Sequence, residues 1–366
     1  MSRPVTLPPD ANRLMALFAR HGFAPSDVPI LQPAEPFIEL SGEDIRRRLF
    51  LVSDGGEAET CLRPEFTIPA ARAYLADGAK RPSAHAYLGP VFRQRAEAPG
   101  EFVQAGLESY GRTDIEAADA EMLALAIEAE ALLDDRRRAI RIGDVGLMRA
   151  LIEALNLPPA LTRRIRQSGL APLAGATPAA PASGLAAYQG VLNALRGADP
   201  GEARAFVKDL LSIAGIKAVG GRTPAEIADR FLEKAADDGV GLSSEQAAIL
   251  DRFRSIAGDP DSVSTSVRKL ASAAGLQLDA ALDRFDARTG FMAARGIDLG
   301  RLVADSGFAR NLDYYSGFVF EFAGSVAGRP AIAGGRYDGL LRRLGAGRDV
   351  PAVGCAIWLE RFGETV

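Results

Sequence analysis

Apolar and polar residues along this chain follow patterns that predict helices and strands at both ends and mostly helices between them. Residues 10–22 have the apolar periodicity of an amphipathic helix. Residues 114–138 predict a long helix whose acidic first turn and basic last turn suit the helix dipole. Two short strand-like runs flank Asp54-Gly55-Gly56 and predict a hairpin, and the segments 83–95 and 101–112 predict further strands.

Proline and glycine interrupt three other segments. ILQPAEPFIEL, residues 30–40, is apolar but contains two prolines, which favours irregular strand and loop over helix. Pro64 suits the first turn of a helix, because the N–H that proline lacks would have no partner there. AIAGGRYDGLLRRL, residues 331–344, predicts a Gly-Gly turn that leads into a helix, whereas GFVFEFAG, residues 317–324, alternates like a strand.

The domain organisation follows from length and pattern. A chain of 366 residues is long for a single core, so we expect two domains or one domain with a large insertion. From about residue 146 to residue 298 the pattern is helical, with an Ala-, Pro-, Gly- and Ser-rich linker at 171–184. The sequence therefore predicts an α+β fold in which residues 1–145 and 299–366 form one strand-rich domain around the helical insertion of residues 146–298.

Composition narrows the classes of function. Charged residues make up 25% of the chain, and a net charge of −4 argues against a protein that mainly coats nucleic acid or an anionic membrane. The two cysteines, Cys61 and Cys355, and the two histidines, His21 and His85, have no metal-ligand spacing. No apolar run is long enough to span a membrane, and the N-terminus lacks a signal-peptide core. We expect a cytoplasmic protein without a metal ion or another cofactor.

Charged and amide side chains recur on extended, glycine-containing backbone. Arg93 and Arg95 in FRQR are two residues apart and share one face of a strand. Gln104 and Glu108 share a face with Gly106, which leaves space for a ligand.

Each of these features has a plain structural alternative. Arg93 and Glu108 could form an ordinary cross-strand ion pair, and Tyr314 and Tyr315 could be one core and one surface aromatic residue. The run Arg136–Arg138 fits a solvated helix end better than a phosphate site.

Taken in order, the motifs resemble those of a known family. LRPEFT, PVFRQR, EFVQAGLE, RNLDYYSGFVFE, AGGRYDGL and PAVGCAIWLERF resemble segments of histidyl-tRNA synthetases, over residues 1–140 and 300–366. The resemblance implies the class II aminoacyl-tRNA synthetase-like fold, an antiparallel sheet flanked by helices, here with a helical insertion. It also implies a dimer formed through the first motif, around ILQPAEPF.

The resemblance assigns a histidine pocket to this chain. The glutamate and threonine of the family's RPEGT motif hold the amino group of histidine, and they correspond to Glu65 and Thr67. Gln104 corresponds to a glutamine beside the amino-acid backbone, and Glu108 and Tyr315 to the pair that binds the two imidazole nitrogens. The residues implied in histidine binding are Glu65, Thr67, Arg93, Gln104, Glu108, Arg310, Tyr314 and Tyr315.

The sequence also departs from that family. The chain ends directly after the third motif, where the family has an anticodon-binding domain, and the loop AEAPGEF lacks the family's arginines. Phe66 replaces the glycine of RPEGT, and Trp358 replaces the glycine of GLER that lets adenine lie against the backbone. Unless Trp358 turns aside into the core, its volume conflicts with adenine. Arg93, Trp358 and Arg361 thus outline a vestigial ATP site, and no catalytic residue is assigned.

This combination is typical of the regulatory subunits of short-form ATP phosphoribosyltransferase. It implies a non-catalytic partner of the short catalytic subunit in a hetero-octamer, at the first step of L-histidine biosynthesis. L-Histidine would be the feedback ligand, and tRNA and membranes would not be partners. The alternative is a tRNA-independent ligase that activates histidine, which Arg93, Arg310 and Arg361 favour and Trp358 opposes. Full tRNA charging and a free-standing histidine-binding module are further alternatives.

Overall fold

The computed structural model describes most of the chain. The described residues are 7, 10–53, 59–79, 81–96, 98–134, 136–168, 201, 205–206, 208–209, 241–309, 314–324 and 328–362. The predicted turn at 54–56 and the predicted linker at 171–184 lie outside them.

The chain divides into two compact units, which we describe separately. Unit 1 comprises Met1–Ala154 and Phe253–Val366, and unit 2 comprises Leu155–Arg252. The helices α5 (Val145–Ala154), α11 (Pro260–Ala273) and α12 (Asp279–Ala294) lie in unit 1. The contacts therefore divide the chain inside the predicted insertion of residues 146–298. In unit 2 the structure describes α6 (Pro159–Ser168) and most of α10 (Ser244–Arg254).

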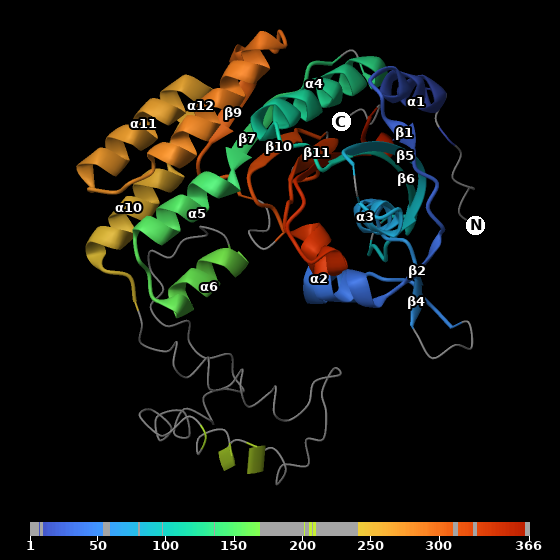
Figure 1. Ribbon diagram of the computed structural model, residues 1–366, viewed down its shortest axis with the longest axis horizontal. Coiled ribbons are helices and arrows are strands. Elements are labelled where there is room, and N and C mark those ends of the chain that lie inside the picture. Colours follow the sequence, from blue (N-terminus) through green and yellow to red (C-terminus); the bar gives the residue numbers. More distant parts are fainter. Residues whose placement is uncertain are drawn as a thin grey trace. The chain divides into compact units, whose positions relative to one another are not determined.

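A nine-stranded sheet organises unit 1 (Figure 1). Its strands, in spatial order, are β1 (Ala24–Pro25), β5 (Ser83–Phe92), β6 (Glu101–Tyr110), β12 (Ala352–Trp358), β11 (Ile332–Arg336), β10 (Phe318–Phe322), β7 (Ile140–Asp144), β9 (Leu302–Asp305) and β8 (Ala257–Gly258). The pairs β1–β5 and β7–β9 are parallel, and the other neighbours are antiparallel. A small antiparallel sheet contains β2 (Leu31–Pro33), β4 (Thr60–Leu62) and β3 (Leu51–Val52).

Helices cover both faces of the central strands. In Figure 1, α3 (Thr67–Ala76) lies inside the curve of β5 and β6, whereas α1 (Ala11–Arg20) and α4 (Ile115–Leu133) lie outside it. Accordingly, every residue of β6 except Glu101 is buried, on both faces. This is the predicted α+β arrangement of a sheet flanked by helices, antiparallel except for the two pairs given above, with Gln104 and Glu108 placed in its interior.

Residues 30–40 differ from the predicted irregular strand and loop. They form β2 followed by α2 (Glu35–Arg46), so the expectation that this segment would not be helical was wrong. Pro36 lies in the first turn of α2, where a helix needs no backbone N–H. The buried side chains of Phe37 and Leu40 anchor the helix in the core.

The segment AGGRYDG also differs from its prediction, a Gly-Gly turn. Gly334 and Gly335 lie within the buried strand β11 rather than in a turn, and a short π-helical segment, η3 (Arg342–Ala346), follows. A Cβ at Gly334 would lie 2.6 Å from Cys355 Cβ, and one at Gly335 would lie 2.9 Å from Val319 Cγ1. These glycines therefore permit close packing against the backbone and side chains of neighbouring strands.

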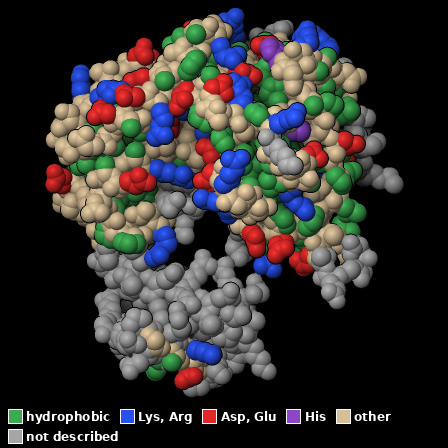
Figure 2. Space-filling view, viewed as in Figure 1, with side chains coloured by type: hydrophobic (Ala, Val, Ile, Leu, Met, Phe, Trp, Pro, Cys, Tyr) green, Lys and Arg blue, Asp and Glu red, His purple; other side chains and the backbone are tan. Residues whose placement is uncertain are grey.

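The surface of the described residues is mixed in charge. Figure 2 shows Lys and Arg interspersed with Asp and Glu over this face, without a continuous basic region. No helix in the described part of the chain is long and apolar enough to cross a membrane. The short 3-10 segments η2 (Leu299–Arg301) and η4 (Leu359–Arg361) complete the described secondary structure outlined above.

Candidate functional site

Glu65 lies at the N-terminus of α3. Its carboxylate accepts hydrogen bonds from the backbone N–H of Thr67 at 2.5 Å and of Ile68 at 3.0 Å, which the first turn of a helix leaves unpaired. Burial raises the pKa of Glu65, while the two N–H donors and the charge of Arg93 act in the opposite direction. Glu65 is thus a structural cap in this structure, and its predicted contact with an amino group stays a prediction.

Glu108 is held in the interior by tyrosines. The hydroxyl groups of Tyr337 and Tyr87 donate to its carboxylate, the latter at 3.4 Å, and the side chain is 1% exposed. Burial raises the pKa of Glu108 to about 8, against the lowering effect of hydrogen bonds from Tyr337, Thr67 and Tyr87. Sequence reasoning did not identify Tyr87 or Tyr337, although Tyr337 lies inside the quoted AGGRYDG segment.

Glycines lie directly beside the Tyr87 and Glu108 side chains on this face of the sheet. Gly106 pairs with Tyr87, and Gly354 pairs with Glu108 in the adjacent strands. A Cβ at Gly106 would collide with the Tyr87 hydroxyl group, and a Cβ at Gly354 would lie 2.6 Å from Glu108 Cδ. The space that Gly106 was predicted to leave for a ligand is therefore bordered by the Tyr87 hydroxyl group and the Glu108 carboxylate.

Phe66 and Trp358, which the resemblance predicts to replace glycines, pack in one hydrophobic cluster. Phe66 stacks on Tyr87 with a centroid distance of 4.4 Å and an interplanar angle of 8°. Trp358 is partly buried against the same cluster, which also contains Phe102. The guanidinium of Arg361 lies 4.5 Å from the Trp358 ring centroid, a cation–π contact.

The arginines predicted to face ATP have acceptors within the chain. Arg93 Nε donates to the Pro64 carbonyl at 2.7 Å, and Arg361 Nη1 donates to the Pro330 carbonyl at 2.5 Å. Burial lowers the pKa of Arg361 to about 10 and also lowers the pKa of Arg93. Arg95, whose Cζ lies 3.5 Å from the Phe102 ring centroid, pairs with Glu360 at 2.9 Å.

Two of the structural alternatives can be compared with the observed geometry. Glu108 lies opposite His85 and Gly354, and Arg93 follows the end of β5, so the two residues are not cross-strand partners. Arg138 is buried and bonds to Asp134, so the basic run after α4 is not entirely a solvated helix end.

Tyr314 and Tyr315 precede β10 and contact each other edge to face, with ring centroids 4.8 Å apart. Both are partly buried, rather than one in the core and one on the surface. Tyr314 also stacks on Tyr337 at 5.5 Å, which joins it to the Glu108 side chain. Arg310 lies outside the described residues.

A buried ionic network lies next to this tyrosine group. Arg336 donates to Asp119 at 2.8 Å and to Asp338 at 2.9 Å. Arg288 from α12 pairs with Asp144 and lies 3.7 Å from Asp119. The network thereby links β11 to α4 and α12. Tyr337 follows directly after β11.

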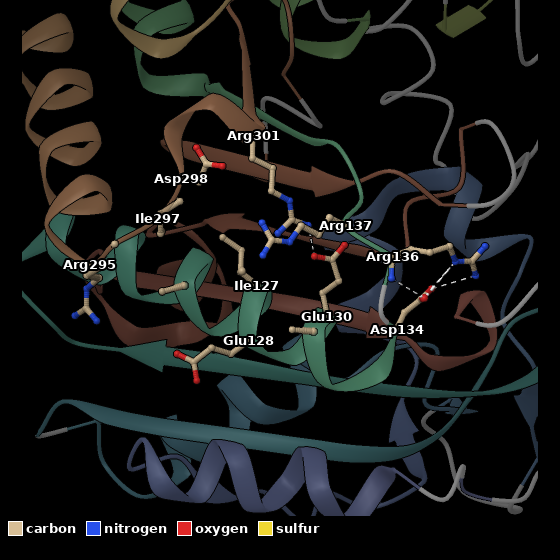
Figure 3. Close-up of a pocket in the computed structure, with 13 residues that line it drawn as sticks. Ile127, Glu128, Glu130, Asp134, Arg136, Arg137, Arg295, Ile297, Asp298 and Arg301 are labelled. Carbon is tan, nitrogen blue, oxygen red and sulfur yellow. Dashed lines mark hydrogen bonds and ion pairs between the residues drawn. The ribbon is translucent and has the colours of Figure 1, made fainter.

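A cavity of about 440 Å³ lies elsewhere in unit 1, between the end of α4 and the connection after α12 (Figure 3). Its charges are largely neutralised within the chain. Arg301 pairs with Glu130, Arg136 with Asp134 at 3.1 Å, and Arg295 with the nearby Glu121 at 2.7 Å. None of the residues that were predicted to bind histidine lines this cavity. In the described part of the chain, no group of three or more His, Cys, Asp and Glu residues could hold a metal ion.

Comparison with known proteins bears on this site. The sequence matches the family described as histidyl-tRNA synthetase over residues 10–171 and 206–362. A protein of Mesorhizobium japonicum named ATP phosphoribosyltransferase regulatory subunit is 39% identical, over 97% of this chain and 96% of that protein. The chain belongs to the ATP phosphoribosyltransferase regulatory subunit family. A member from Rhizobium rhizogenes, with the same name, is 37% identical over 98% of each chain.

Solved structures confirm the predicted class II synthetase fold for this family member. A crystal structure from Bacillus halodurans, described as an ATP phosphoribosyltransferase regulatory subunit/histidyl-tRNA synthetase, has a TM-score of 0.67 at 21% identity. That alignment covers 98% of this chain and 82% of the other. Histidyl-tRNA synthetase from Nostoc sp. PCC 7120 has a TM-score of 0.64 at 19% identity and covers 98% of this chain and 74% of the other.

Proposed function

We propose that this chain is a non-catalytic regulatory subunit that the short-form ATP phosphoribosyltransferase catalytic subunit requires for activity. That enzyme would carry out the first step of L-histidine biosynthesis, in the cytoplasm. One observation carries the proposal: the chain is 39% identical, over nearly its whole length, to a protein named for this regulatory role. The geometry around Phe66 and Trp358 supports it independently.

In the proposed regulatory subunit, the region that the resemblance assigns to ATP is closed to synthetase chemistry. Phe66 and Trp358 add two aromatic rings to one cluster where the resembling synthetases have glycines. Arg93 and Arg361 each donate one hydrogen bond to a backbone carbonyl, which orients both guanidinium groups within the chain. Nucleotide binding as in a synthetase would have to displace a packed aromatic ring.

Histidine is the proposed feedback ligand, at the site of Glu65, Thr67, Gln104, Glu108 and Tyr315. Glu108 and the tyrosines around it offer polar partners in the interior of the sheet, which suits a ring with two nitrogens. Docking of this subunit would favour the active state of the catalytic chain, and bound histidine would favour another state. Such coupling is limited by the ligand's differential affinity for the two states, typically about 1–3 kcal/mol.

The proposed assembly is a hetero-octamer that contains dimers of this chain. The segment predicted as the dimer interface exposes Ile30 and Leu31, at 43% and 51%. Exposed aliphatic side chains on adjacent positions suit burial in a subunit interface.

Reconstitution tests the regulatory role. The short catalytic chain from the same source is assayed for phosphoribosyl-ATP formation from ATP and phosphoribosyl pyrophosphate, alone, with this protein, and with added L-histidine. We expect activity to rise on mixing and to fall as histidine is added. Absence of activation at every subunit ratio would contradict the proposal.

The alternative function is a tRNA-independent ligase that activates histidine, and the presence of Arg93 and Arg361 favours it. Histidine-dependent exchange of pyrophosphate into ATP separates the two functions, because only an adenylating enzyme catalyses it. We expect no exchange above the level without histidine, with an authentic histidyl-tRNA synthetase as the positive control. Exchange that depends on both ATP and histidine would support the ligase.

A further inference from the structure

Gln104 and Trp358 form a matched pair of buried polar atoms. They lie directly opposite each other in β6 and β12, so their side chains leave the same face of the sheet. Gln104 Oε1, a hydrogen-bond acceptor, and Trp358 Nε1, a donor, are both buried, and neither has a hydrogen-bond partner among the described residues. Buried polar atoms without partners are costly, so a complementary pair of them needs an explanation.

We propose that this pair binds the α-amino and α-carboxylate groups of a free amino acid, with the Trp358 N–H as the donor to the carboxylate. The inference rests on the proposed function, because it specifies how the proposed histidine site recognises its ligand. Gln104 Oε1 accepts from the ammonium group, because an amide oxygen can only accept. Its counterpart in the related synthetases is a glutamine beside the amino-acid backbone. Trp358 is the new element, because the resembling family has glycine at this position.

The spacing of the two residues suits the α-amino and α-carboxylate groups of an amino acid. Directly opposed residues of an antiparallel pair have Cβ atoms roughly 5 Å apart. An amino acid carries its ammonium and its carboxylate on one carbon, so both can contact neighbouring side chains at the same time. Glu108 lies on the same face, roughly 13 Å further along the strand by Cα spacing, where it can contact the side chain of the ligand.

The contact between Arg361 and Trp358 supports the assignment. The guanidinium lies over the indole ring, 4.5 Å from its centroid, and limits the directions in which the N–H can point. It also adds a positive charge near the proposed carboxylate. A regulator differs here from a ligase. A ligase must leave the carboxylate free to attack ATP, whereas a regulator can hold it with a permanent donor.

Three ligands that differ by one group test the assignment by calorimetric titration of the full chain. They are L-histidine, histamine, which lacks the carboxylate, and 3-(imidazol-4-yl)propionate, which lacks the amino group. Trp358→Phe keeps an aromatic ring and removes the N–H. We expect this substitution to weaken the binding of L-histidine and of the propionate about tenfold or more, and the binding of histamine less than twofold. Gln104→Leu should weaken the binding of L-histidine and histamine but leave the binding of the propionate unchanged.

The unmodified protein provides a measurement that needs no substitution. Trp358 is the single tryptophan of the chain, so intrinsic fluorescence reports on this indole alone. We expect both ligands that carry a carboxylate to shift its emission, and histamine at saturation to leave it nearly unchanged.

The outcomes separate this inference from the regulatory proposal. Equal weakening of all three ligands by Trp358→Phe would mean that the indole only shapes the site, and would overturn the inference. Unchanged affinities, or no binding of any of the three ligands to the unmodified protein, would overturn it as well. Activation of the catalytic subunit is measured separately with the unmodified protein. A failure of the regulatory proposal would appear in that assay and not in the ranking of ligands.

Discussion

The carboxylate of Glu108 lies over Gly354, the residue directly opposite it in β12. A Cβ at position 354 would come within 2.6 Å of Glu108 Cδ and 2.6 Å of the Leu107 carbonyl oxygen. Contacts this short force one side to move, and the Leu107 contact is with backbone. The absence of a side chain at 354 therefore allows an acidic group to lie in the interior of the sheet.

Gly354→Ala should displace Glu108 from the tyrosine hydroxyl groups and reduce histidine affinity at least tenfold. We expect a loss of unfolding free energy of about 1–3 kcal/mol, because the strand must shift to accept the methyl group. Gly290→Ala is the matched control. Gly290 lies within helix α12, and its Cβ would have no neighbour within 4 Å, so that variant should gain about 0.5–1 kcal/mol. Urea denaturation and calorimetric titration measure both effects, and an unchanged histidine affinity in Gly354→Ala would contradict the prediction.

The ionisation of Glu108 should make the stability of the ligand-free protein depend on pH. Its folded-state pKa of about 8 is above the usual 4.5, so the folded chain retains a proton that the unfolded chain has lost between these values. The unfolding free energy should therefore fall as pH rises from about 4.5 to 8, by up to about 1.4 kcal/mol per pH unit from this group. Glu108→Gln cannot ionise and should lack that component. Urea denaturation between pH 5 and 8 compares the slopes, and equal slopes for the two proteins would exclude this role of Glu108.

Arg336 should be more important for stability than any single exposed arginine. It donates to both Asp119 and Asp338 while nearly inaccessible to solvent. Arg336→Ala leaves Asp119 buried beside one remaining cation, and we expect a loss of about 3–5 kcal/mol or failure to fold. Asp119→Asn should also destabilise the fold while keeping the side-chain volume.

Arg268 supplies the comparison for that prediction. It pairs with Asp279, Asp283 and Asp286, all of which are exposed. Arg268→Ala should cost no more than about 1 kcal/mol. Similar losses in Arg268→Ala and Arg336→Ala, measured by chemical denaturation, would show that burial of the network does not determine its contribution.

The proposed dimer interface predicts a change in assembly without a change in fold. Leu31→Asp places a charge on a side chain that is 51% exposed in β2, so the subunit itself should remain folded. If Leu31 is buried between subunits, the dissociation constant should rise at least tenfold, consistent with about 1.5–3 kcal/mol for a buried aliphatic side chain. Phe291→Asp, at a position 46% exposed on α12, is the control and should leave the dimer intact. Sedimentation velocity over a concentration series distinguishes the two, and equal behaviour of both variants would argue against this interface.

Local sequence was sufficient for the elements whose pattern and packing agree. The helices α1 and α4 and the strands β5 and β6 were predicted from periodicity, and each lies within the expected residues. The helix expected from Pro64 begins at Thr67, three residues later, with Glu65 as its cap. The prediction was wrong for two segments, because proline and glycine each occur in two structural contexts. Pro36 favoured irregular structure by its sequence but lies in the first turn of α2, and the glycines of β11 predicted a turn but allow strands to pack closely.

The sequence by itself determined the family, because ordered motifs identify it without any coordinates, and through the resemblance it assigned the residues of the proposed histidine site. Only the tertiary structure decided what those side chains contact. Tyr337 reaches Glu108 from 229 residues away along the chain, and Trp358 meets Gln104 through strand register. Such contacts depend on how distant strands align, and local patterns contain no information on that alignment. The same alignment buries Glu108 and raises its pKa, a property that a carboxylate in an isolated segment would not have.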